Sequence, residues 1–200
     1  MTSTRSFLRS GGVAVRLTLL STVVLGVAYP LAVWGVGQAA FSSQANGSMI
    51  TDSSGKTVGS SLIGQSFAGE DADRWFQSRP SAAGEDGYDA GASTGSNLGP
   101  SNPDLTKAVE ERRAAIAAAD GVPASEVPAD ALTASGSGLD PHISPAYAEQ
   151  QVSRVAAARG LSEVDVRALV AEHTDGRQLG FLGDPAVNVL ELNLALAELG

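Results

Sequence analysis

The sequence at residues 17–37 reads LTLLSTVVLGVAYPLAVWGVG, an uncharged and mostly apolar run that decides the architecture of the chain. As an α-helix, its 21 residues rise about 31 Å at about 1.5 Å per residue, which matches a hydrocarbon core of about 30 Å. The run therefore predicts a transmembrane helix over residues 17–38. Residues 1–16 then form a short N-terminal tail, and residues 39–200 form a separate domain.

The distribution of charge around the run predicts its orientation. Arg5, Arg9 and Arg16 precede it, and the first carboxylate of the chain is Asp52. Because basic residues are enriched on the cytoplasmic side of a span, we expect the N-terminal tail in the cytoplasm. The sequence thus predicts a single-pass protein of the cell (inner) membrane with an extracytoplasmic C-terminal domain.

A cleaved signal peptide is the alternative interpretation of the same run. The small residues at 37–40 are tolerable for cleavage, but the run is longer than the roughly 7–15 apolar residues of a signal core. A retained span also suits its small residues, which allow a second helix to approach closely. The residues expected at such a helix contact are Ala28, Pro30, Ala32 and Gly35.

The composition after the run limits the partners of the domain. Ten of the 13 basic residues and all 22 acidic residues lie there, which gives a net charge of −12. A domain of about 160 residues is large enough for its own core, but an acidic one is unsuited to binding nucleic acid or anionic lipid. The chain has no cysteine, so disulfides and thiolate metal sites are excluded.

Local signals predict an α+β domain with a small β-sheet and about four helices. A turn-forming DSSG at 52–55 separates two β-prone segments at 48–50 and 57–63, which indicates a hairpin. A loop rich in Gly and Ser follows at 84–103, and loops of such length in compact domains are functional or disordered. Residues 122–145 form a second irregular segment.

Capping residues mark where the predicted helices begin and end. The first three helices run from Asn102-Pro103 to Gly121, from Ser144-Pro145 to Gly160, and from Ser162 to about His173. Asp184-Pro185 is expected to open a C-terminal helix, whose apolar stripe comprises Val189, Leu192, Leu196 and Leu199.

Two catalytic patterns in the chain are explained better as turns and loops. SGKT at 54–57 resembles the end of a phosphate-binding loop, but Ile50 stands where the full pattern needs glycine. GASTG at 91–95 matches the nucleophile pattern of serine hydrolases, yet its flanks read neither as a strand before it nor as a helix after it. We therefore predict no catalytic residue.

The two histidines, His142 and His173, do not predict a metal site. Neither has potential ligands at a recognisable spacing, so a structural role is the expectation for both. Two long polar loops on a helical scaffold, tethered to a bilayer, favour binding a partner over catalysis.

Five separated motifs resemble one protein family. They are YPL at 29–31, WFQSRPS at 75–81, GSNLGPSNP at 95–103, VPADALTASGSGLDPHISP at 127–145 and VNVLELN at 187–193. In order and spacing they resemble the C subunit of the bacterial Kdp complex, a high-affinity potassium-transporting P-type ATPase. The similarity to this KdpC family extends from about Arg16 to Leu196, which is nearly the whole chain.

The resemblance implies a non-catalytic subunit that serves in assembly and modulation. The implied partners are the P-type ATPase subunit, whose DKTGT phosphorylation motif this chain lacks, and the channel-like potassium-translocating subunit. The span would pack beside these subunits, with the domain over the outer mouth of the channel-like one. Partner contacts are expected in and around the loops at 84–103 and 130–145, at Trp75, Arg79, Asn97, Asn102, Asp140 and His142.

The resemblance also implies a role as a catalytic chaperone that raises the ATP affinity of the pump subunit. The nucleotide contacts that it implies fall at Ser135, Gly136, Ser137 and Gly138. The chain is then expected to carry no cofactor of its own and to meet ATP through the complex. This conflicts with the predicted orientation, because ATP is hydrolysed in the cytoplasm. In that orientation, the domain can alter the ATP affinity of the pump subunit only through a coupling free energy transmitted across the membrane, typically about 1–3 kcal/mol.

Three functions stay open on the sequence alone. The first is an assembly and modulatory subunit, which the motifs and the orientation favour. The second is a subunit that binds nucleotide directly. The third is a free, membrane-anchored binding protein for another extracytoplasmic ligand.

Overall fold

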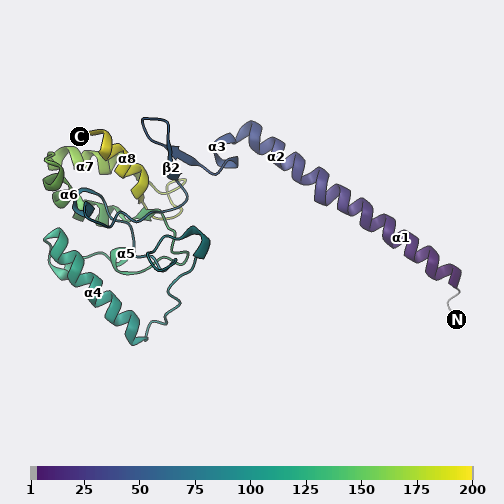
Figure 1. The fold of residues 1–200 in the computed structure, drawn as a ribbon, viewed down its shortest axis with the longest axis horizontal. Helices are drawn as coiled ribbons and strands as arrows, with labels where there is room; N and C mark the ends of the chain where they lie inside the picture. Colours follow the sequence, from purple (N-terminus) through teal and green to yellow (C-terminus); the bar gives the residue numbers. More distant parts are fainter. Residues whose placement is uncertain (1–3, 200) are drawn as a thin grey trace. The chain divides into compact units, whose positions relative to one another are not determined.

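The computed structural model describes residues 4–199, which form two compact units. The first unit ends at Ser48 and is almost entirely one long helix, whereas the second begins at Met49 and is an α+β domain (Figure 1). The α+β prediction for the C-terminal domain is thus confirmed. The side chain of Arg5, one of the residues used to predict orientation, lies outside the described part of the chain.

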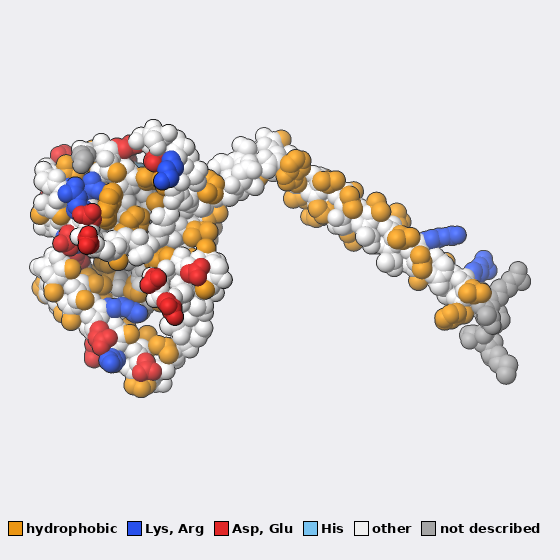
Figure 2. Space-filling view, in the orientation of Figure 1, with side chains coloured by type: hydrophobic (Ala, Val, Ile, Leu, Met, Phe, Trp, Pro, Cys, Tyr) orange, Lys and Arg blue, Asp and Glu red, His pale blue; other side chains and the backbone are white. Residues whose placement is uncertain are grey.

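The predicted apolar helix is confirmed and extends beyond residues 17–38 in both directions. It consists of α1 (Thr4–Val23), the π-helical turn η1 (Val24–Ala28) and α2 (Tyr29–Ala40), followed by the single turn α3 (Ser42–Ala45). The 35 residues Ser6–Ala40 are long and apolar enough to cross a membrane. Figure 2 shows Lys and Arg side chains near the N-terminal end of this helix and hydrophobic side chains along the rest.

Pro30 accounts for the π-helical turn. A proline inside a helix cannot donate to the carbonyl four residues before it, here that of Gly26, and its ring collides with that carbonyl. The helix widens in η1, where the Tyr29 N–H donates to the carbonyl of Val24, five residues back. This wider turn accommodates the proline without ending the helix.

The predicted hairpin is confirmed at the start of the second unit. β1 (Met49–Thr51) pairs antiparallel with β2 (Thr57–Ser60). In the turn, the Asp52 carboxylate accepts from the backbone N–H groups of Ser54 and Lys56 at 2.9 and 3.0 Å, an arrangement typical of Asp in turns. The residues that resemble a phosphate-binding loop therefore form a hairpin turn.

Three of the four predicted helices begin and end close to where the sequence places them. They are α4 (Pro103–Asp120), α6 (Pro145–Arg159) and α7 (Glu163–Glu172). The side chains of Asn102, Ser144 and Ser162 accept a backbone N–H at the start of each helix. Gly121 and Gly160 end α4 and α6 in the left-handed conformation, at φ +67° and +69°.

The expectation that Asp184-Pro185 opens the C-terminal helix is wrong. β5 (Ala186–Asn188) follows instead, and α8 (Val189–Leu199) begins after it. β5 is the middle strand of a second sheet, in which β3 (His142–Ile143) and β4 (Thr174–Asp175) are its antiparallel neighbours. Pairing on both sides satisfies the backbone of β5, and neither partner strand is visible in the local sequence pattern. Leu199 is 46% exposed and does not belong to the packed stripe.

The segments expected to be irregular contain short elements. They are η3 (Ala90–Ala92), η4 (Ala124–Glu126), α5 (Ala129–Leu132) and β3, while one further short element, η2 (Ala72–Arg74), precedes these segments. The interpretation of residues 122–145 as irregular is therefore wrong in part, because elements of two to four residues are too short to show a periodic pattern.

The hydrophobic core of the second unit lies around α6, α8 and β5. Val152 and Val155 of α6, Leu192 and Leu196 of α8, and Val187 of β5 are almost fully buried. In Figure 1, α6, α7 and α8 lie together in one half of this domain, and α4 runs along the other half. Long loops connect the two halves.

Candidate functional site

The segment Trp75–Ser81 connects the core to the surface loops, and its first half is held by buried side chains. The backbone N–H and carbonyl of Phe76 both bond the Asn193 side chain of α8 at 2.9 Å. The Gln77 N–H donates to Oε1 of Gln151 on α6 at 2.6 Å. Asn193 and Gln151 are 2% and 0% exposed, and buried polar groups of this kind need partners. The segment is therefore fixed to both helices.

Arg154 of α6 strengthens this attachment. Its Nε lies 2.7 Å from Oδ1 of Asp120 at the end of α4, and the two side chains are 8% and 3% exposed. Its other N–H groups donate to the carbonyls of Ala72, Asp73 and Trp75 and to the side chain of Gln151. The term buried clamp is used below for Asp120, Gln151, Arg154 and Asn193.

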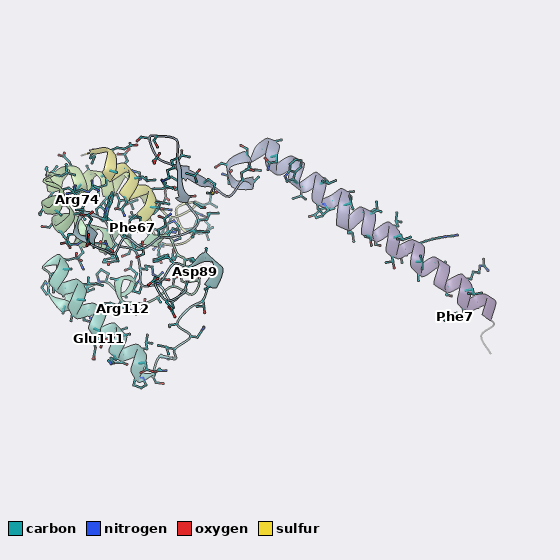
Figure 3. All side chains as sticks on the ribbon, viewed as in Figure 1. Phe7, Phe67, Arg74, Asp89, Glu111 and Arg112 are labelled. Atoms are coloured by element: carbon teal, nitrogen blue, oxygen red, sulfur yellow. The ribbon has the colours of Figure 1, made fainter. Side chains whose placement is uncertain are left out.

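Trp75 packs beside the buried clamp. Its ring centroid lies 6.4 Å from that of Phe67, and the guanidinium of Arg159 lies 4.2 Å from the Trp75 centroid. This is a cation–π contact. Figure 3 labels Phe67 and Arg74 in this part of the domain. The contacts of Trp75 thus hold the loop before Phe76 onto α6.

The second half of the segment joins the surface loops together. Nη1 of Arg79 donates to Oδ2 of Asp140 at 2.9 Å, and these side chains are 23% and 28% exposed. The Tyr88 hydroxyl donates to the Arg79 carbonyl at 2.7 Å, and the Ser81 hydroxyl donates to the Gly138 carbonyl at 2.6 Å. The loops at 84–103 and 130–145, which were predicted to be functional, are therefore both bonded to residues 79–81.

Residues 135–138, the predicted nucleotide contacts, form part of this packing. The Ser93 hydroxyl donates to the Ser137 carbonyl at 2.9 Å. A Cβ added to Gly138, which adopts φ +68°, would lie 2.6 Å from the Thr94 carbonyl oxygen and 2.8 Å from Cβ of Ala83. Glycine is required at 138 by its backbone conformation and by this close approach.

The backbone of the same loop directs two of its N–H groups inward. The Gly138 N–H donates to the Ser135 carbonyl at 3.3 Å, and the Leu139 N–H donates to the Ser137 hydroxyl at 3.1 Å. The chain continues from the loop into β3, not into a helix, whereas phosphate loops commonly present N–H groups at a helix N-terminus. Residues 135–139 therefore form a loop packed against neighbouring segments and lack the geometry common in phosphate-binding loops.

Asp140 and His142 lie together beside Arg79, and they form an ion pair when His142 is protonated. Oδ1 of Asp140 accepts from the His142 backbone N–H at 3.0 Å and lies 3.4 Å from Nδ1 of its ring. The side-chain hydrogen bond between them raises the pKa of His142 and lowers the pKa of Asp140. Burial raises the pKa of Tyr88. The term polar loop cluster is used below for Arg79, Ser81, Tyr88, residues 135–138, Asp140 and His142.

The remaining predicted contacts lie outside this cluster. Asn102 caps α4 by accepting the Asp104 N–H at 2.8 Å. Asn97 is exposed, adopts φ +54° and donates to the Thr94 hydroxyl at 3.4 Å. The structure thus brings Arg79, Asp140 and His142 together with residues 135–138, while Trp75 and Asn102 make local structural contacts.

A cleft of about 340 Å³ opens beside the polar loop cluster. Its lining includes Arg79, Tyr88, Tyr147 and, from α4, Arg112. Nη1 of Arg112, which is labelled in Figure 3, donates to the carbonyl of Leu132 in α5 at 3.0 Å. Among residues 4–199, no three or more His, Asp and Glu side chains are grouped so as to hold a metal ion.

Sequence reasoning missed the buried clamp and Asn188. Oδ1 of Asn188 accepts from the Leu190 and Glu191 N–H groups at 3.1 and 3.2 Å, which caps α8, and its Nδ2 donates to the Ser61 carbonyl at 2.8 Å. The available signal was the asparagine pair in the otherwise apolar VNVLELN at 187–193. Asparagine in such a run indicates a buried hydrogen bond to another segment.

Comparisons with known proteins identify the class. The model of a family of potassium-pump subunits, described as K⁺-transporting ATPase, c chain, matches residues 12–198. The chain belongs to this family, KdpC.

Three relatives are named potassium-transporting ATPase KdpC subunit. The protein of Kineococcus radiotolerans is 62% identical over 191 residues, which cover 96% of this chain and 94% of the relative. That of Sorangium cellulosum is 57% identical over 183 residues, 92% of this chain and 94% of the relative. That of Mycobacterium bovis is 53% identical over 187 residues, 93% of this chain and 96% of the relative.

Proposed function

We propose that this chain is a non-catalytic subunit that assembles and modulates an ATP-driven, high-affinity potassium uptake complex. The observation that carries the proposal is the polar loop cluster, in which the segments 75–81 and 127–145 are bonded together on a rigid scaffold. Polar loops positioned in this way are typical of recognition surfaces. The family, and the names of the relatives, supply the kind of complex.

The proposed partners are the channel-like potassium-translocating subunit and the P-type ATPase subunit. Arg79, Asp140 and His142 are half-buried, so each has a partner within the chain and still presents polar atoms outward. A partner surface with complementary charges is therefore the natural ligand of the cluster.

The long helix is proposed to anchor the chain in the cell (inner) membrane and to contact the partner subunits there. Arg9 and Arg16 precede its apolar part, which supports a cytoplasmic N-terminus and an extracytoplasmic C-terminal domain. Ala28 and Ala32 are small residues one turn apart, and a Cβ at Gly35 would meet nothing within 4 Å. These residues, together with the wider turn before Pro30, leave room for a neighbouring helix.

Modulation of ATP affinity is proposed to act through coupling between subunits rather than through nucleotide contact by this chain. Two observations support this view. The Gly138 and Leu139 N–H groups are engaged within the loop, and the proposed orientation separates this loop from cytoplasmic ATP. A coupling of about 1–3 kcal/mol corresponds to a change of roughly 5- to 150-fold in affinity.

Deletion of the chain tests the proposed function directly. Cells without it are expected to yield no intact complex and to fail to grow at limiting potassium. Restoration by the full-length chain is the control. Potassium-stimulated ATPase activity at the wild-type level in its absence would contradict the proposal. Labelling of residues 135–138 by a photoactive ATP analogue, competed by ATP, would favour direct nucleotide binding instead.

A single cysteine tests the orientation. Because the chain has no cysteine, S53C in the exposed β1–β2 turn introduces its only thiol. A membrane-impermeant maleimide is expected to label S53C in sealed, right-side-out vesicles. Labelling that requires lysis of the vesicles would place the domain on the cytoplasmic side.

A further inference from the structure

We propose that the cleft beside the polar loop cluster binds a small zwitterion, a solute that carries both a carboxylate and an ammonium group, as free α-amino acids do. The volume of the cleft, about 340 Å³, lies within the range of small-molecule sites. This inference goes beyond the proposed function, because it concerns a solute that the chain binds by itself. Its tests therefore use no partner subunit.

The hydroxyl of Tyr147 is a buried donor that the chain leaves unused. Tyr147 is 3% exposed, and its hydroxyl makes no hydrogen bond within residues 4–199. Among the buried and half-buried side chains of those residues, only Nε of Arg79 lacks both a partner and contact with solvent. The Tyr147 hydroxyl therefore still meets solvent, in the cleft that Tyr147 lines. Because buried polar groups rarely lack a partner, this hydroxyl marks the place of a ligand atom.

Arg112 of α4 provides the positive charge for a carboxylate. Its Nη1 donates to a backbone carbonyl of α5 at 3.0 Å, while its Nε and Nη2 have no acceptor within the described residues. Arg79 is already engaged, since its Nη1 and Nη2 bond Asp140 and a backbone carbonyl. Burial raises the pKa of Tyr147, so its hydroxyl is protonated at neutral pH and can donate. A guanidinium with free N–H groups and a phenol suit a carboxylate.

Two carboxylates at the mouth of the cleft suit an ammonium group. Glu85 and Asp86 line the cleft and are exposed, and neither forms an ion pair within residues 4–199. The Tyr88 N–H donates to the Ser81 hydroxyl at 2.8 Å, which closes the loop that carries them. Charges of both signs in one cleft match a zwitterion. A simple anion would be repelled by the net charge of −12 after the apolar run.

The remaining lining favours a zwitterion with an apolar side chain. Phe67, Pro80 and Ile116 line the same cleft, and Figure 3 labels Phe67 and Arg112. Small-molecule sites commonly combine apolar walls with a few polar groups that fix orientation. Leucine is a suitable probe, because it can place its charged groups on the polar lining and its side chain on the apolar wall.

Isothermal titration calorimetry of the full-length chain in detergent tests the proposal with three matched probes. L-Leucine carries both charges, isocaproate carries only the carboxylate, and isoamylamine carries only the ammonium group. We expect saturable binding of leucine and at least about tenfold weaker binding of the other two, since each loses a charge-assisted contact. An absence of saturable leucine binding, or equal affinity for isocaproate, would overturn the proposal.

Variants on the carboxylate side of the cleft assign the contacts. Y147F removes only the unpartnered hydroxyl, so it is expected to unfold at the wild-type temperature and to weaken leucine binding roughly threefold. R112Q is expected to weaken it at least about tenfold. R113Q is the matched control, because Arg113 lies on the same helix but does not line the cleft. Wild-type affinity in both Y147F and R112Q would overturn the proposed site.

A double variant at the mouth of the cleft tests the ammonium side. E85Q/D86N is expected to weaken binding of leucine at least about tenfold and to leave that of isocaproate no weaker. Both substitutions are at exposed positions, so the unfolding temperature should stay at the wild-type value. Unchanged leucine affinity, or equal weakening for leucine and isocaproate, would contradict the assignment of a zwitterion.

Discussion

Two arginine–aspartate pairs in the same domain differ in what surrounds them. Arg154 and Asp120 of the buried clamp lie 2.7 Å apart and are 8% and 3% exposed. Arg79 and Asp140 of the polar loop cluster lie 2.9 Å apart and are 23% and 28% exposed. Each Arg154 nitrogen has a partner, whereas Nε of Arg79 is buried without one within the described residues. The buried pair is fully hydrogen-bonded within the domain, whereas one N–H of the Arg79 guanidinium has no hydrogen-bond partner there.

The largest effect is expected from breaking the buried clamp. R154M leaves the buried Asp120 carboxylate without its charged partner, with only the Gln150 amide still donating to it, and breaking a buried ion pair in this way typically costs about 3–5 kcal/mol. Denaturant unfolding of the full-length chain in detergent measures this loss. R167M is the matched control, because Arg167 and Glu149 are 48% and 49% exposed and such pairs contribute about 0–1 kcal/mol. Equal losses in the two variants would show that burial does not separate the two kinds of pair.

A smaller effect is expected from crowding the polar loop cluster. G138A combines a φ of +68° with a Cβ placed 2.6 Å from the Thr94 carbonyl oxygen, so the loop at 94 must shift. G160A has φ +69° but meets nothing within 4 Å, and it isolates the backbone strain of roughly 1–2 kcal/mol. G138A is expected to cost more than G160A in unfolding and to reduce recovery of the complex. If G160A reduced recovery equally, packing at 138 would not explain the loss.

The smallest effect is expected from the charge of His142. Its pKa is raised by Asp140, with Asp175 and Glu191 contributing further negative charge and Arg79 bonded to the same Asp140 carboxylate. A raised pKa adds stability that is fully present below the unfolded value of about 6.5 and is lost as pH rises through the folded pKa. The lowered pKa of Asp140 adds stability that is lost as pH falls through its folded pKa, below 3.8.

H142Q is therefore expected to remove a gain of under about 1 kcal/mol, because the pair is partly exposed. From pH 5.5 to 8.5 the melting temperature of the wild-type chain should fall more than that of H142Q. An unchanged pH profile in H142Q would contradict the assigned ion pair. H173Q is the control, since it changes the other histidine of the chain.

The elements predicted correctly from the sequence are those with local signals. The apolar run predicted the long helix, DSSG predicted the hairpin turn, and the N-cap residues Asn102, Ser144 and Ser162 predicted three helix starts. The strand β5 was mistaken for a helix start because its hydrogen bonds go to residues 142–143 and 174–175. No pattern in the sequence around Pro185 indicates this pairing, because the partner strands lie elsewhere in the chain.

The sequence predicted which segments contribute to the candidate site, but it did not predict which of their side chains pair with one another. The loops around 84–103 and 130–145 were expected to be functional, and the structure brings parts of both together. Neither the pairing of Arg79 with Asp140 nor the attachment of Phe76 to Asn193 is visible in spacing, since these partners lie 61 and 117 residues apart. The roles of these loops in partner contact stay predictions.

Recovery of the partner subunits with R79Q tests the central claim most directly. The account predicts that R79Q, which removes the half-buried Arg79–Asp140 pair, destabilises the chain less than R154M does and still lowers recovery of the complex at least tenfold, by about 1.4 kcal/mol or more of binding free energy. R167Q, which removes a more exposed pair outside the cluster, with side chains 48% and 49% exposed, is expected to leave recovery unchanged. Recovery of R79Q equal to that of R167Q and the wild type would contradict the assignment of the polar loop cluster to partner binding.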